Sequence, residues 1–124
     1  MNLRDSILQA QTGGPQQNPD GTVTFEFRFR PDDPTFAGHF PGRPILPGVF
    51  QLEMARLAAE QVLPGPLAVR EIRKAKFQRP ILPDETVRVE LKCDDLNGTI
   101  QAHAVFSVLG QAAGVTTLCL TRGE

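Results

Sequence analysis

Two residues near the middle of the chain, His39 and Glu53, are of types that exchange protons near neutral pH. His39 lies in a segment, residues 38–49, that reads GHFPGRPILPGV. Five prolines between residues 31 and 47 each remove a backbone donor and restrict the residue before them, so this stretch is expected to be a stiff loop without regular structure. The loop leads directly into a predicted helix that carries Glu53.

The start of that helix, at Gly48, is suited to binding an oxygen that gains negative charge. No Ser, Thr, Asp or Asn residue precedes Gly48 as a cap, so the first backbone N–H groups are free to bind a ligand at the positive end of the helix dipole. Gly48 has no side chain to hinder a close approach. The side chain of Glu53 points back toward this end, where a partly buried carboxyl group could act as an acid. A histidine base, a carboxylic acid and such donors together suit proton abstraction beside a thioester carbonyl.

Each of these residues also has a structural interpretation. His39 could be a loop histidine bound to a backbone carbonyl, and Glu53 could pair with Arg56, and Arg56 with Glu60, in a surface ladder. His103 is predicted to lie on the polar face of a strand, at the surface. A cluster of basic residues is most simply a solvated strand face; it comprises Arg73, Lys74, Lys76 and Arg79.

The composition limits the classes of function. The 124 residues fit a single domain, residues 1–124, with 40% hydrophobic and 22% charged residues. A net charge of −1 gives no reason to expect nucleic acid, and no apolar run is long enough to cross a membrane. The first residues lack the apolar core of a signal peptide, so a cytoplasmic protein is expected. The two cysteines and two histidines have no metal-site spacing, and no nucleotide-binding glycine motif is present.

The elements that position these residues begin with the helix. Residues 48–63 are predicted to form the single helix of the chain, between Pro47 and the helix-breaking sequence Pro64-Gly65-Pro66. Its charged positions form one narrow stripe, and almost all its other positions are apolar. Such a helix is buried nearly all round and needs a sheet wrapped about it.

Strands are predicted on both sides of this helix. Residues 22–30 alternate apolar and polar side chains and form the clearest strand, after a turn at residues 18–21. Residues 7–12 could form a first strand, and residues 13–18 are predicted to be a loop. After the helix, strands are expected at residues 67–77, with a bulge near Arg70-Glu71, and at residues 86–93.

The last two strands follow a hairpin turn at Asn97-Gly98. Residues 100–108 present an apolar face, a turn is expected at residues 110–114, and the last strand at residues 115–121. The order of elements predicts an α+β fold, in which an antiparallel sheet wraps around one long central helix.

Two segments resemble motifs of the 3-hydroxyacyl-[acyl-carrier-protein] dehydratases of the FabZ/FabA type. Residues 39–49, HFPGRPILPGV, followed by Glu53, resemble the active-site signature of that family, and residues 76–85, KFQRPILPDE, resemble its second motif. The match runs from about residue 38 to residue 89. The resemblance implies a hot-dog fold and a homodimer with both active sites at the interface, where the histidine of one subunit faces the carboxylate of the other.

The resemblance also implies an activity: dehydration of a 3-hydroxyacyl thioester on acyl carrier protein to the trans-2-enoyl thioester. His39 would take the α-proton, Glu53 would help the β-hydroxyl leave as water, and the N–H groups of Gly48 and Val49 would polarise the thioester carbonyl. No metal or organic cofactor is needed. The basic cluster then becomes a candidate docking surface for the acidic carrier protein.

The chain departs from the family pattern at Leu57, where a glutamine usually follows the acid by one helical turn, and in its N-terminal region. Both departures indicate a divergent member, serving fatty acid synthesis or a related polyketide or aryl polyene-type pathway. A hot-dog thioesterase and a non-catalytic module that binds acyl groups or the carrier protein are the alternatives. A hexamer built from the dimers is a further alternative.

Overall fold

The computed structural model describes residues 2–36 and 44–123. In chain order the elements are a helix α1 (Leu3–Ala10), strands β1 (Gln11–Gln17) and β2 (Val23–Arg28), a 3₁₀ turn (Pro34–Phe36), the helix α2 (Gly48–Val62), and strands β3 (Leu67–Phe77), β4 (Thr86–Leu96), β5 (Thr99–Val108) and β6 (Gln111–Arg122).

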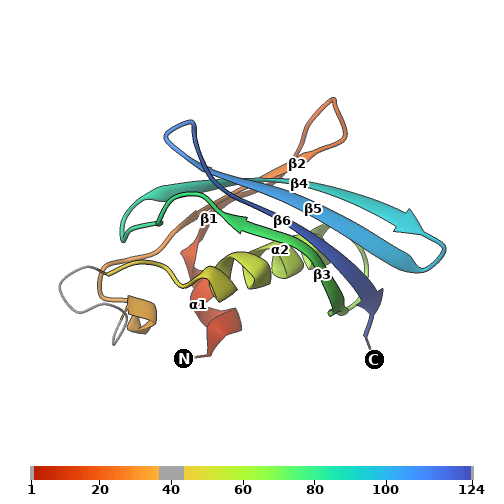
Figure 1. Cartoon of the computed structure of the whole chain (residues 1–124), viewed down its shortest axis with the longest axis horizontal. Coiled ribbons are helices and arrows are strands. Elements are labelled where there is room, and N and C mark those ends of the chain that lie inside the picture. Colours follow the sequence, from red (N-terminus) through yellow and green to blue (C-terminus); the bar gives the residue numbers. More distant parts are fainter. Residues whose placement is uncertain (1, 37–43, 124) are drawn as a thin grey trace.

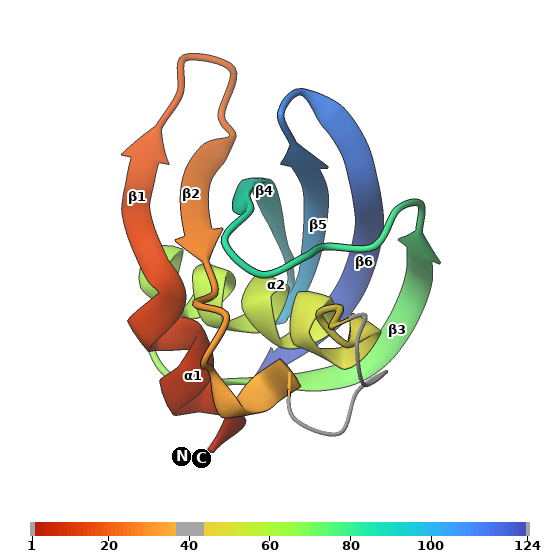
Figure 2. The same ribbon diagram turned by 90° about the vertical axis from the view of Figure 1, so that its left-hand side faces the viewer.

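The described strands form one antiparallel sheet in the order β1-β2-β4-β5-β6-β3. The sheet curves around α2, which lies in its concave face (Figures 1 and 2). β2 and β3, which α2 separates in the chain, lie far apart in the sheet, and β3 forms one end of the sheet next to β6. The predicted α+β arrangement of a sheet around one central helix is confirmed.

The core lies between the helix and the concave face of the sheet. The predicted alternation is confirmed in β2 and β5, whose inward side chains are fully or almost fully buried. On the helix side the core is filled by Met54, Ala55, Leu57, Ala58 and Ala59. On the sheet side it is filled by Val23, Phe25, Phe27, Ile100, Ala102, Ala104, Phe106 and Val108.

The prediction that α2 is the single helix is wrong, because residues 3–10 form α1 instead of contributing to a first strand at residues 7–12. The Asn2 side chain accepts a hydrogen bond from the Asp5 N–H (2.8 Å), which caps this helix. Ile7 and Ala10 are buried on the side where α1 packs against α2. The cap and this spacing are helix signals in the sequence.

The predicted loop at residues 13–18 is also wrong, because most of it belongs to β1. As an edge strand, β1 is exposed over most of its length and needs no alternating apolar pattern. Its register against β2 shifts on either side of Gly13. The 3₁₀ turn Pro34–Phe36 is a short exception to the irregular structure expected for residues 31–47.

Three further features of the sheet concern predicted turns and breaks. The register shift of β3 against β6 between Val69 and Glu71 confirms the bulge predicted there. Asn97 (φ 56°) and Gly98 (φ 89°) form the predicted tight hairpin. The turn expected at residues 110–114 lies earlier, at Leu109 and Gly110, so β6 begins at Gln111 and Gly114 lies inside the strand.

Gly114 lies directly against the helix. A Cβ atom at this position would overlap the side-chain oxygen of Gln51, which is 3% exposed, and would lie 3.0 Å from the Lys76 carbonyl oxygen. Strand β6 can therefore pass α2 closely only because residue 114 has no side chain.

We expect Gly114→Ala to lower the free energy of unfolding by about 1–3 kcal/mol, because the added methyl group overfills a closed space. Urea denaturation measures this loss. Adding Gln51→Ala removes the atom that the new methyl group overlaps, and the double variant should recover part of the loss. Equal stability of Gly114→Ala and the wild-type protein would contradict this account.

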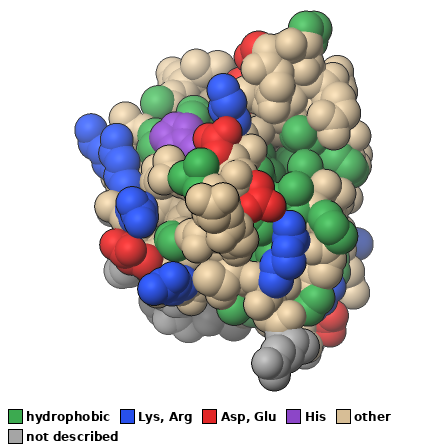
Figure 3. Space-filling view, turned by 90° about the vertical axis from the view of Figure 1, so that its right-hand side faces the viewer, with side chains coloured by type: hydrophobic (Ala, Val, Ile, Leu, Met, Phe, Trp, Pro, Cys, Tyr) green, Lys and Arg blue, Asp and Glu red, His purple; other side chains and the backbone are tan. Residues whose placement is uncertain are grey.

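Charged side chains of both signs lie on the surface of the molecule. Figure 3 shows basic and acidic side chains next to one another on one end of the molecule. Exposed ion pairs such as Arg88–Glu90 (3.7 Å) and Arg122–Asp95 (3.2 Å) are of the kind that contributes little to stability. Among the helices of the described residues, none is both long and apolar enough to cross a membrane.

Candidate active site

The N-terminus of α2 is held in place by the two segments that flank it. Pro47 is the N-cap residue and, as predicted, no side chain among the described residues caps the helix. The Leu46 N–H donates to the Ile81 carbonyl (2.8 Å), and the Phe50 N–H donates to the Pro47 carbonyl (3.0 Å). The loop between β3 and β4 therefore fixes the point at which the chain enters α2.

Gly48 makes room for an aromatic ring. A Cβ atom at Gly48 would lie 2.9 Å from Cε2 of Phe77. Phe77 is the last residue of β3, and its side chain is half exposed. The sequence predicted open space for a ligand at Gly48. Part of that space is occupied by Phe77, which the sequence did not indicate as a residue of the site. Val49, one position later, is exposed.

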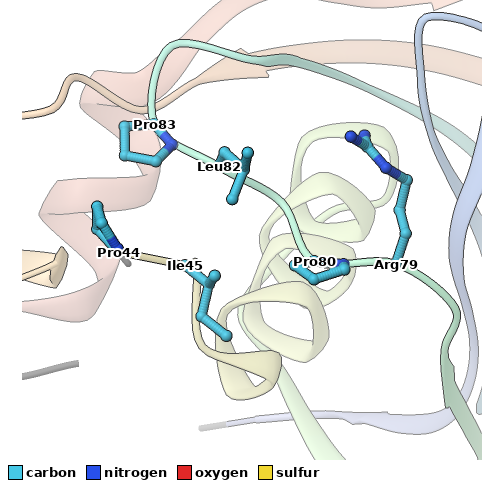
Figure 4. A pocket seen from close by; sticks show the side chains of 6 residues that line it. All are labelled: Pro44, Ile45, Arg79, Pro80, Leu82 and Pro83. Carbon is cyan, nitrogen blue, oxygen red and sulfur yellow. The ribbon is translucent and has the colours of Figure 1, made fainter. Parts of the chain in front are cut away.

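Two adjoining cavities lead to this helix end. The first, of about 540 Å³, is lined by prolines and aliphatic side chains together with one arginine: Pro44, Ile45, Arg79, Pro80, Leu82 and Pro83. Figure 4 shows that these residues come from two segments, with Pro44 and Ile45 on one and the other four on the loop after β3. The second, of about 280 Å³, shares Ile45, Arg79 and Pro80 with the first and reaches Gly48 and Gln51. The two cavities adjoin through these shared residues, and the second, which Gln51, Gln78 and Arg79 line together with apolar side chains, lies at the start of α2.

Arg79 lines both of these cavities. Its guanidinium pairs with the Glu85 carboxylate (3.0 Å), which also accepts the Leu82 N–H (2.8 Å). Its Nη1 atom is buried with no hydrogen-bond partner among the described residues. Arg79 therefore closes the turn between β3 and β4 and lies apart from the other basic residues of the predicted docking cluster.

The other three members of that cluster lie on the edge strand. Arg73, Lys74 and Lys76 are exposed along β3. Lys74 pairs in register with Thr117, and Lys76 with Val115, on the outer face of the sheet. Arg73 is 3.7 Å from the Glu71 carboxylate. His103 is exposed, as predicted, and its Nδ1 lies 2.9 Å from the Thr117 hydroxyl.

Glu53 is bound by Arg56, as in the ion-pair ladder that the sequence offered as the structural alternative to a catalytic role. The Nε atom of Arg56 donates to both carboxylate oxygens (2.6 and 3.2 Å), and Nη2 donates as well. On the other side of the guanidinium, Nη1 donates to Glu60 (3.0 Å) and to the Leu67 carbonyl (3.0 Å). The hydrogen bond to Glu53, followed by the charges of both carboxylates, outweighs burial and raises the pKa of Arg56 above its ordinary value.

Glu60 anchors the other end of this ladder. Burial by itself would raise the pKa of Glu60, but the Leu67 N–H and the guanidinium groups of Arg4 and Arg56 outweigh it and hold the pKa below its usual value. Glu60 accepts the Leu67 N–H (2.8 Å) and lies 3.2 Å from Arg4 of α1. The carboxylate of Glu60 therefore joins α1, α2 and the start of β3.

His39 lies outside the described residues, so its distance from Glu53 stays a prediction. Within the described part of the chain, no cluster of three or more histidine, cysteine, aspartate or glutamate side chains is arranged to hold a metal ion. Cys93 and Cys119 are free thiols. Burial, and to a smaller degree Asp94, raises the pKa of the Cys93 thiol to about 11, so this thiol is protonated at neutral pH.

Sequence comparison gives a family for most of the chain. Residues 15–116 match a family model described as ApeI-like, ApeI dehydratase. The chain is 36% identical over 87 residues to a 3-hydroxyacyl-[acyl-carrier-protein] dehydratase FabZ of Desulforamulus reducens, covering 64% of this chain and 61% of that protein. It is 31% identical over 105 residues to the FabZ of Rickettsia massiliae, covering 77% of this chain and 72% of that protein. The chain thus spans about three fifths of the length of the first relative.

Structure comparison gives the same fold. The dehydratase heterocomplex ApeI:P from Xenorhabdus doucetiae matches with a TM-score of 0.73 at 25% identity, covering 86% of this chain and 93% of that one. The fluoroacetyl-CoA-specific thioesterase FlK, as its F36A mutant, matches with a TM-score of 0.66 at 14% identity, over 89% of both chains. At that identity the second likeness concerns the fold alone. The hot-dog fold predicted from the sequence is confirmed.

Proposed function

This chain belongs to the ApeI-like dehydratase family, and on that premise we propose that it dehydrates a 3-hydroxyacyl thioester, carried by acyl carrier protein, to the trans-2-enoyl thioester in fatty acid or related acyl synthesis. The observation that carries the proposal is the family match, which includes all of α2 and its carboxylate Glu53. The largely apolar first cavity beside the start of α2 supports it, since an acyl chain needs an apolar site near the reacting groups.

In the proposed reaction, His39 takes the proton from the α-carbon of the substrate. The electron pair of that C–H bond forms the double bond, and the bond from the β-carbon to its hydroxyl breaks. Glu53, as the acid, gives the hydroxyl a proton, and the hydroxyl leaves as water. Charge that develops on the thioester oxygen is stabilised by the N–H groups of Gly48 and Val49 at the start of α2. The residues of the chain supply every group in this scheme, so no cofactor is invoked.

Product analysis tests the reaction class. The purified protein is incubated with a 3-hydroxyacyl thioester and, separately, with a 2-enoyl thioester, while enoyl absorbance and free thiol are followed. Interconversion of the two thioesters without release of thiol supports the proposal. Release of thiol would make the protein a thioesterase, and binding of the acyl carrier without turnover would make it a binding module.

We propose further that two copies of the chain form a homodimer along β3. This strand ends the sheet, and no other described strand lies beside its outer edge. Its residues that pair with the inward positions of β6 are apolar and yet exposed; they include Ile72 (49% exposed) and Phe77 (50%). An exposed edge with an apolar face is typical of a surface that a partner covers.

This dimer would complete the active site, because His39 of one subunit would face Glu53 of the other. The competing occupant of the edge is a different subunit, since the similar ApeI structure is a heterocomplex named ApeI:P. The oligomeric state of the isolated chain distinguishes the two.

The carrier protein is proposed to dock on the outer face of β3, where Lys74 and Lys76 are exposed. We expect Lys74→Glu combined with Lys76→Glu to raise KM for a carrier-bound substrate by roughly tenfold, because the reversed charges repel an acidic partner. Steady-state kinetics on the carrier-bound substrate, beside the same acyl group on free pantetheine, measure this difference.

The effect should be confined to the carrier-bound substrate and should shrink at high salt. Lys92→Glu on β4 is the matched control, since Lys92 is also exposed but lies away from the edge strand. A docking role for β3 is ruled out if the double variant and Lys92→Glu give the same KM.

A further inference from the structure

The carboxylate of Glu53 is bound by a guanidinium that is itself fixed from two other elements. Among the described residues, the hydrogen bonds to Glu53 come from Arg56 alone, through Nε and Nη2. Both side chains are about one-fifth exposed, so neither is free in solvent. From this arrangement we infer that Arg56 is a positioning residue that holds Glu53 for the reaction; the inference rests on the proposed function.

The remaining nitrogen of Arg56 fixes the direction of the group. Nη1 lies between Glu60 Oε2 and the Leu67 carbonyl, each at 3.0 Å. Glu60 in turn accepts the Leu67 N–H and pairs with Arg4. A guanidinium is planar and donates in a fixed fork, so anchoring one nitrogen determines where the other two point. They point at Glu53.

No alternative support for Glu53 comes from the next turn of the helix. Leu57 is apolar and 2% exposed, so it offers no hydrogen bond to a carboxylate four residues before it. Arg56 occupies the adjoining position, three residues after Glu53, where side chains on a helix also meet. The Arg56 guanidinium therefore holds the Glu53 carboxylate, which the apolar side chain of Leu57 cannot do.

The split between kcat and KM separates positioning from helix stability. Replacing a residue that merely stabilised the helix would lower the stability of the protein and leave kcat of the folded enzyme unchanged.

The experiment compares kcat and KM of dehydration in the full chain and its variants. Arg56→Gln should lose about tenfold or more in kcat with little change in KM, which corresponds to roughly one lost charge-assisted interaction in the transition state. Arg56→Lys keeps the charge without the planar fork and should recover part of kcat.

Two further variants keep the test independent of folding. Glu60→Gln leaves Arg56 against Glu53 but weakens its anchor, so it should give an intermediate loss of kcat. Arg88→Gln, which removes an arginine from an exposed pair with Glu90 on β4, should behave as the wild type. Thermal unfolding shows which variants are folded.

The outcomes separate the two claims. If the wild-type protein dehydrates the substrate and folded Arg56→Gln has the same kcat, the role of Arg56 is overturned and the proposed function stands. If the wild-type protein dehydrates no 3-hydroxyacyl thioester, the proposed function fails and this inference fails with it.

Discussion

His39→Ala and Glu53→Gln are each expected to lose about two to four orders of magnitude in kcat, the scale of a lost acid or base, while a mixture of the two variants recovers activity. The reason is the proposed composition of the site, with one residue from each subunit. A mixed dimer has one site with both residues intact and one site with both residues changed. Random pairing makes half of the dimers mixed, so about a quarter of the wild-type activity should return.

Coexpression of the two variants with different affinity tags allows mixed dimers to be isolated directly, and these should have about half of the wild-type activity because one of their two sites is intact. Enoyl absorbance measures the activity of each preparation. His103→Ala and Glu90→Gln are the matched controls, because both side chains lie on the face of the central strands β4 and β5 that points away from α2, and both variants should stay active. Mixed dimers no more active than the single variants would show that His39 and Glu53 do not act across subunits. Full activity of either single variant would remove that residue from the catalytic pair.

Ile72→Glu is expected to yield a folded monomer with dehydratase activity reduced by roughly a hundredfold or more. In the isolated subunit this side chain is half exposed, so a carboxylate there is solvated and the fold should persist. In the proposed dimer the same carboxylate would be buried against a partner strand without a counter-charge, which is strongly unfavourable. Light scattering after size-exclusion chromatography gives the mass, and thermal unfolding gives the stability.

Leu109→Glu is the control for this change. Leu109 is 93% exposed at the β5–β6 turn, so the same apolar-to-charged replacement should alter neither mass nor activity. An Ile72→Glu protein that stays dimeric and active places the interface elsewhere. A wild-type chain that is itself monomeric overturns the homodimer and favours a heterologous subunit on β3.

The central part of the fold could be predicted because its signals are local and strong. Alternation in residues 22–30 and 100–108 and the apolar helix between Pro47 and Pro64 specify where each element buries its side chains. The resemblance of residues 39–49 to a family signature supplied the candidate chemistry.

The missed helix α1 had local signals, but the errors at β1 and Gly114 fall where tertiary contacts override local sequence. β1 is polar and contains Gly13, Gly14 and Pro15, yet it is a strand because β2 offers an edge to pair with. Gly114 looked like part of a turn, but its missing side chain instead admits Gln51 of the helix. Such a glycine can be distinguished from a turn glycine only when the neighbouring element is known.

The ladder on α2 could be predicted in part. The spacing of Glu53, Arg56 and Glu60 gave the ion pairs, but the sequence cannot show that the Leu67 backbone anchors both Arg56 and Glu60. That contact depends on how the chain returns from α2 into β3. The Leu67 backbone fixes the Arg56 guanidinium, so the ion pair with the candidate acid Glu53 is held in one position.

The position of β3 at the end of the sheet has a consequence for how the chain folds. β4, β5 and β6 follow one another as hairpins with tight turns and can form from local contacts. β3 precedes them in the chain but pairs with β6, the last of the three, so we expect it to dock after the local hairpins have formed. Its addition closes the sheet over α2 and at the same moment creates the edge proposed to receive a second subunit. Association of subunits is therefore expected to be a late step, which begins only once the helix is enclosed.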